Sequence, residues 1–67
     1  MDVNDARTRL ISLQAERFHA LELGIEYPSP YMTRLENAIA DAGRDYVMVA
    51  VLEIATLRGQ LAGAARG

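Results

Sequence analysis

The residues with the clearest capacity for chemistry are a glutamate and a histidine, Glu16 and His19, which form a Glu-x-x-His pair. In di-iron helical bundles such pairs bind metal together with glutamates from facing helices, and Glu53 is a further potential ligand in this chain. Two copies of the chain would supply a comparable set of donors. A metal-binding helical bundle is therefore one hypothesis, and a solvated glutamate and histidine is the default.

The expected positions of these side chains argue against the metal site. Projected onto a helix, Glu16 and His19 lie on the polar half of the first predicted helix, whereas Glu53 lies in the apolar stripe of the second. A lone buried carboxylate is costly. We therefore expect Glu53 to lie at a rim or to pair with an arginine of a second chain, with a ligand or proton-transfer role as the alternative. No metal and no cofactor are expected.

Other catalytic patterns are absent from the sequence. There is no Ser/His/Asp spacing and no glycine-rich phosphate loop, and His19 is the single histidine. The formal net charge is −2 and all seven basic residues are arginines. This mild acidity gives no electrostatic reason to bind nucleic acid or anionic lipid. We therefore expect a protein that is not an enzyme, and the charge does not favour nucleic acid as a partner.

The most apolar stretch, residues 46–57, carries one charged residue. It is too short to cross a bilayer, which needs about 20 apolar residues, so no membrane association is expected. The chain begins with acidic residues where a secretory signal would be basic, and we expect a cytoplasmic protein.

The sequence predicts a single all-α domain over residues 1–67, folded as an antiparallel helical hairpin. A first helix is expected over about residues 4–23, with one half of its surface apolar: Val3, Ala6, Leu10, Ile11, Leu13, Phe18 and Leu21. Gly24 should end it, and residues 24–29 should form a short turn. Ser29 and Pro30 have the order of an N-cap and first residue of a second, longer helix. That helix is expected over about residues 30–62, followed by a frayed tail at 63–67.

Two alternatives for the second helix stay open. The apolar stripe keeps one phase across Gly43, which favours a continuous helix, but a break there would let Asp45 cap a third helix and give a three-helix bundle. The valine-rich residues 46–54 are also compatible with a strand, with residues 25–27 as its partner.

Residues 27–31, with two tyrosines and two prolines, form either a recognition loop or simply a capped turn.

The two predicted helices differ in length, and this predicts self-association. In the hairpin Arg17 should face Glu36, while the first helix ends opposite about residue 50. Apolar positions continue beyond that point and need a cover. We therefore predict a homodimer with four helices, centred on Val47, Val51, Ile54, Leu57 and Leu61.

The expected role is a small protein–protein interaction or assembly module that binds itself and another protein. A small transcription regulator or antitoxin is the alternative, and it would need a basic surface created by the dimer.

Overall fold

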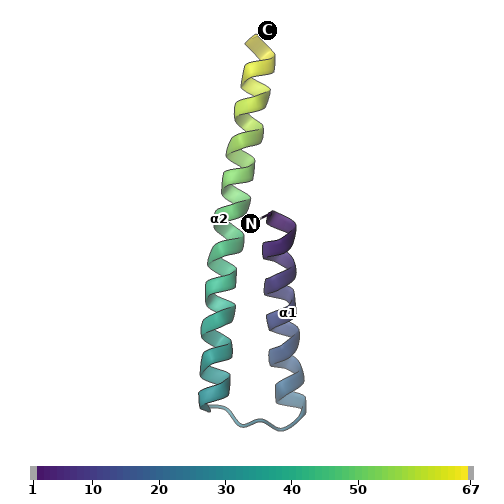
Figure 1. Ribbon diagram of the computed structural model, residues 1–67, viewed down its shortest axis with the longest axis vertical. Helices are drawn as coiled ribbons and strands as arrows, with labels where there is room; N and C mark the ends of the chain where they lie inside the picture. The colour runs from purple at the N-terminus through teal and green to yellow at the C-terminus, as the bar shows by residue number, and fades with distance from the viewer. Residues whose placement is uncertain (1, 67) are drawn as a thin grey trace.

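The computed structural model describes residues 2–66, with side chains described over residues 2–63. Two helices, α1 (Val3–Glu22) and α2 (Pro30–Arg66), lie antiparallel and are joined by a short turn (Figure 1). Residues 2–66 contain no strand, so the strand alternative for residues 46–54 is wrong. The all-helical hairpin predicted from the sequence is confirmed.

The end of α1 is fixed by its glycine. Gly24 has a φ of 83°, a backbone conformation that glycine adopts without steric cost. The backbone N–H of Gly24 donates to the carbonyl of Leu21 at 3.1 Å, and that of Ile25 donates to Ala20 at 3.1 Å. These two bonds form a Schellman motif, and Ile25 folds back onto the small core beside Ala20.

The start of α2 is fixed by Ser29. The Ser29 Oγ accepts a hydrogen bond from the backbone N–H of Met32 at 3.2 Å, and its carbonyl accepts one from Thr33 at 2.9 Å. Pro30 is the first helical residue, where its missing N–H costs nothing. The predicted Ser-Pro cap is therefore present.

The core between the helices is small and lies in the half of the molecule near the turn. Met32 is completely buried, and Leu35 and Ala20 pack with it, flanked by Leu13 and Ile39. Small residues, Ala6 on α1 and Ala42 on α2, are buried further from the turn and let the two helices approach closely. The fully covered apolar surface is thus restricted to the facing stripes of the two helices.

α2 runs without interruption through Gly43, so the three-helix alternative broken at that residue is wrong. The apolar residues before and after Gly43 stay on one side of the helix and pack on α1. This packing outweighs the roughly 1 kcal/mol that a glycine costs in a helix. Asp45 does not cap a third helix. It accepts a hydrogen bond from Arg9 of α1, with Nη1 and Oδ2 3.2 Å apart.

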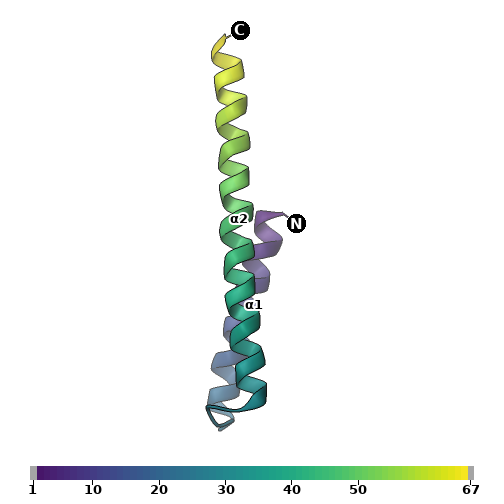
Figure 2. The same cartoon turned by 90° about the vertical axis from the view of Figure 1, so that its left-hand side faces the viewer.

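α2 is much longer than α1, as Figures 1 and 2 show from two directions. Its last part, residues 51–66, projects beyond the end of α1, and we refer to these residues as the overhang. The molecule is consequently a rod with extents of 60 × 15 × 13 Å. The helix continues to Arg66 rather than ending at residue 62, because Ala64 and Ala65 are strong helix formers. Of the tail expected to fray, residue 67 lies outside the described residues.

Candidate functional site

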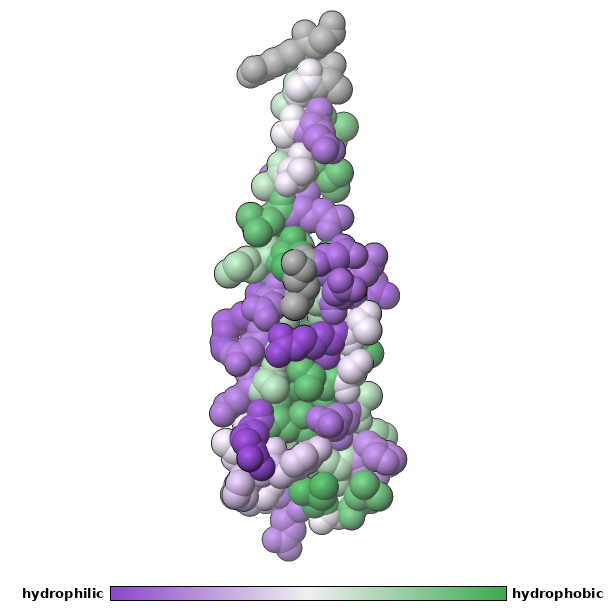
Figure 3. All heavy atoms as spheres, in the orientation of Figure 1, coloured by the Kyte–Doolittle hydropathy of each residue, from purple (hydrophilic) through white to green (hydrophobic). Residues whose placement is uncertain are grey.

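The overhang exposes five large apolar side chains. Residues 51–63 are all exposed. The large apolar side chains among them are all more than half exposed: Val51 57%, Leu52 60%, Ile54 52%, Leu57 51% and Leu61 70%. Figure 3 shows hydrophobic surface along this upper part of α2 as well as on the lower half of the rod. Large contiguous apolar patches are rare on the surface of monomeric proteins.

Four of the five interface residues predicted from the sequence lie in one row. Val47, Val51, Ile54 and Leu61 are separated by three, four or seven residues, so they share a face of α2, with Leu57 at its margin on the α1 side. Val47 is 60% exposed although it lies within reach of the end of α1. None of these residues is needed to cover the core of its own chain.

Two ion pairs mark the edges of the α1–α2 contact and show which way this row faces. Arg17 Nε lies 3.8 Å from Glu36 Oε1 on one edge, as the predicted hairpin pairing requires, and Arg9 pairs with Asp45 on the other. On α2, Glu36 is followed at helical spacing by Ala40, Gly43 and then the apolar row beginning at Val47.

α1 contributes one large apolar residue, Leu21, to the same edge as Glu36. Leu21 follows Arg17 by one turn, whereas Phe18 and Ile11 lie further around the helix, on the side that points away from α2. Phe18 is 64% exposed, Ile11 52% and Leu21 41%. The sequence grouped these three with the buried half of the helix, but α2 is too narrow to cover an apolar sector of that width. We refer to the combined surface as the Glu36 face: Leu21 of α1, and Glu36, Ala40, Gly43, Val47, Val51, Ile54 and Leu61 of α2.

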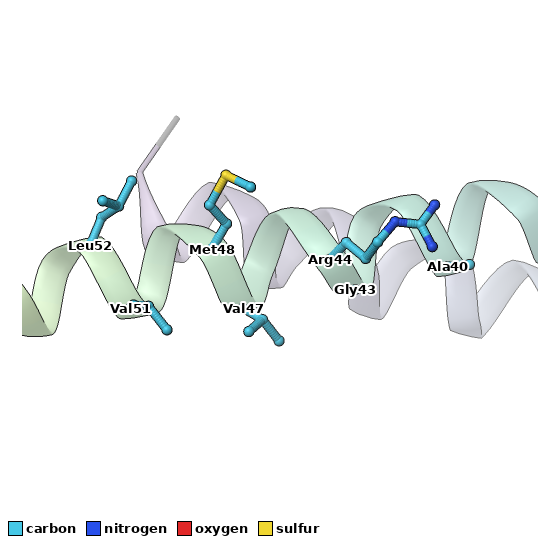
Figure 4. Close-up of a pocket in the computed structure, with 7 residues that line it drawn as sticks. All are labelled: Ala40, Gly43, Arg44, Val47, Met48, Val51 and Leu52. Atoms are coloured by element: carbon cyan, nitrogen blue, oxygen red, sulfur yellow. The ribbon is translucent and has the colours of Figure 1, made fainter.

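A shallow depression lies at the middle of α2, where its side chains are smallest. Ala40 and Gly43 form its floor, and Figure 4 shows Val47 and Val51 pointing to one side of the helix and Met48 and Leu52 to the other. A Cβ atom added at Gly43 would meet no atom within 4 Å. The packing of its own chain therefore does not explain why a residue that weakens the helix stands there.

The charges on the Glu36 face are only partly paired. Oε1 of Glu36 is buried and receives no hydrogen bond from any described residue, since Arg17 remains 3.8 Å away. Arg58 interrupts the apolar row between Ile54 and Leu61 and forms no ion pair with a described residue of its own chain. Arg44, by contrast, pairs with Asp41. Glu53 is exposed on the overhang, so in the single chain it is not a buried charge.

The structure places Glu16 and His19 on the exposed side of α1. Within residues 2–66 no group of three or more His, Cys, Asp or Glu side chains is close enough to hold a metal ion.

The turn tyrosines, Tyr27 and Tyr31, are exposed at 62% and 38%. The Tyr27–Pro28 peptide bond is cis. A shallow hollow lies next to them, lined by the two prolines with Ser29, Thr33 and Arg34, and no described side chain there is buried and unpaired. The capped-turn interpretation accounts for the hydrogen bonds of this segment.

Neither α1 nor α2, over the part of the chain that is described, combines the length and apolarity needed to span a bilayer. Comparisons of the sequence and structure with protein-family models, curated proteins and solved structures gave no match.

Proposed function

We propose that this protein is a small, non-enzymatic assembly module that forms a homodimer through the exposed apolar row of α2. Two hairpins would contribute four helices. The observation that carries the proposal is the overhang, in which half of a long helix has no covering element in its own chain. The interface is centred on Val47, Val51, Ile54, Leu57 and Leu61, all of which are more than half exposed.

The energetic argument rests on the size of this surface relative to the core. Burying a large aliphatic side chain contributes about 1.5–3 kcal/mol. Ile54, Leu57 and Leu61 together would therefore supply several kcal/mol, which is comparable to the whole stability of a small domain, about 5–15 kcal/mol. A second copy is the simplest cover because a two-fold axis closes the assembly with one kind of interface.

The neighbouring side of α2 supports the second part of the proposal, that the dimer binds another protein. Met48 is 63% exposed and Leu52 60%, and in Figure 4 they project to the other side from Val47 and Val51, although all four line one depression. A dimer centred on the row of Val47 leaves the outer part of this side open.

The proposal is tested by placing a carboxylate on either side of the overhang. Leu57→Asp puts an unpaired charge into the interface, whereas Leu52→Asp, the matched control, puts it about 140° away around the same helix. Both leucines are exposed in the single chain, at 51% and 60%, so neither substitution should unfold the hairpin. We expect Leu57→Asp to be a helical monomer and Leu52→Asp to remain a dimer in size-exclusion chromatography with light scattering. Equal masses for the two variants would contradict the proposed interface.

A further inference from the structure

The Glu36 face combines two surfaces that a second copy could use in different ways. The overhang carries apolar residues at one end of the rod, and Leu21 of α1 is exposed near the other. A parallel dimer would place each part of this face against the same part of the second copy, with Glu36 opposite Glu36 and Arg58 opposite Arg58. An antiparallel dimer would bring each overhang to the lower half of the other hairpin.

We propose that the second copy binds antiparallel, with a two-fold axis beside Val47, so that each overhang lies along the Glu36 face of the other hairpin. This inference rests on the proposed homodimer and assigns its orientation and its contacts. At each level of the rod three helices would then run side by side: α1 and the lower half of α2 from one copy, and the overhang from the other. The overhang and the lower hairpin are complementary surfaces because each copy lacks the helix that the other supplies.

The axis position follows from the sizes of the residues along α2. Ala40 and Ile54 are equally far from Val47 along the helix, and so are Gly43 and Val51. An antiparallel pair centred on Val47 therefore places the small residues of one copy opposite the β-branched residues of the other. This gives Gly43 a packing role that its own chain does not supply, because a Cβ there would meet nothing within 4 Å.

The same axis pairs the two incompletely satisfied charges. Glu36 and Arg58 are also equally far from Val47, on opposite sides. Arg58 of one copy would thus lie opposite Glu36 of the other, whose side chain is 35% exposed although its Oε1 is buried within its own chain. A guanidinium has several donors in a fixed geometry and pairs well with the accessible part of such a carboxylate. This pairing also explains why an arginine interrupts the apolar row of the overhang.

The contacts with α1 follow from the same arrangement. The overhang of one copy runs parallel to α1 of the other, because both are antiparallel to the same α2. Leu61 then lies at the level of Leu21, which is 41% exposed in the single chain. Leu21, which α2 of its own chain covers only in part, gains a cover in this way.

The test exchanges the two charges between chains. Glu36→Arg alone gives a homodimer with arginine opposite arginine, and Arg58→Glu alone gives one with glutamate opposite glutamate. When the two variants are mixed, the antiparallel heterodimer has an arginine opposite a glutamate at both sites. We expect each variant alone to dimerise at least about tenfold more weakly than wild type, and the mixture to regain dimerisation. Loss of the Arg17–Glu36 pair in the Glu36→Arg chain is the same alone and in the mixture, so it does not account for the recovery.

Cross-linking gives a second, independent readout, since the chain has no cysteine. Leu61→Cys should not form an intermolecular disulfide, because in the antiparallel dimer the two copies of residue 61 are about 40 Å apart at 1.5 Å per residue. A parallel dimer would bring them within the roughly 7 Å between Cα atoms that a disulfide requires.

The outcomes separate this inference from the function on which it rests. A wild-type protein that is a monomer overturns both. A wild-type dimer whose charge variants show no gain on mixing, or whose Leu61→Cys variant cross-links readily, overturns the antiparallel arrangement and leaves the homodimer in place. Charge variants that each dimerise more weakly than wild type and recover on mixing, without cross-linking at residue 61, support the antiparallel arrangement; a parallel dimer already pairs like charges in the wild type, so neither variant alone would weaken it.

Discussion

Gly43→Ala should have opposite effects on the folding of one chain and on the association of two. Gly43 lies in the interior of α2, and an alanine there favours the helix by about 1 kcal/mol. A Cβ at this position meets nothing within 4 Å in its own chain, so no steric cost offsets that gain. In the antiparallel dimer, however, the same Cβ would point at Val51 of the second copy.

The magnitudes can be worked from these facts. At concentrations low enough to keep the chain monomeric, a gain of about 1 kcal/mol should raise the Tm of so small a domain by about 4–8 °C. In the dimer, one extra methyl group on each copy should separate the two helices, and overpacking of this kind typically costs about 1–3 kcal/mol. The dimer dissociation constant should therefore rise by about tenfold or more, since 1.4 kcal/mol is a factor of ten.

Gly59→Ala is the matched control for this experiment. Gly59 is also within α2, and a Cβ there also meets nothing within 4 Å, but the residue lies on the opposite side of the helix from Gly43. It should increase helicity without weakening the dimer. Thermal unfolding by circular dichroism and sedimentation equilibrium give the two quantities for each variant. If Gly43→Ala and Gly59→Ala change dimer affinity equally, the close approach of two helices at Gly43 is refuted.

Two further predictions concern the hairpin itself. Ser29→Ala should destabilise the protein by about 0.5–2 kcal/mol, because the N–H of Met32 loses its side-chain acceptor. Thr33→Ala, at an exposed position, is the control. A denaturation midpoint that Ser29→Ala leaves unchanged would count against the cap. Protein purified without chelator should contain no stoichiometric first-row metal, since Glu16 and His19 are exposed; one equivalent of iron, zinc or manganese that disappears in His19→Ala would show that they are ligands.

The hairpin could be predicted because its signals are local. Gly24 ends α1 and the Ser29–Pro30 pair starts α2, and each acts through backbone geometry within a few residues. The pairing of Arg17 with Glu36 then follows from a short turn between antiparallel helices. The continuity of α2 through Gly43 could be predicted for a related reason, because apolar residues that keep one helical period on both sides of a glycine indicate a single helix.

The surfaces on either side of the helix contact could not be assigned from the sequence. Periodicity shows that Ile11 and Phe18 are on the apolar half of their helix, but not that a single partner helix leaves them exposed. Likewise, it does not show that Gly43 lacks contacts or that an oxygen of Glu36 is buried without a hydrogen bond. These properties depend on the direction of approach of the second helix, which becomes visible only in three dimensions.

The central claim is that one copy of this chain is incomplete, and the mass of the wild-type protein in solution tests it most directly. Sedimentation equilibrium at micromolar concentrations should give twice the 7.4 kDa of a single chain. Dilution should shift the protein toward the monomer, because the fraction of dimer depends on the protein concentration. A mass of 7.4 kDa at every concentration, with the helices fully formed, would contradict the claim.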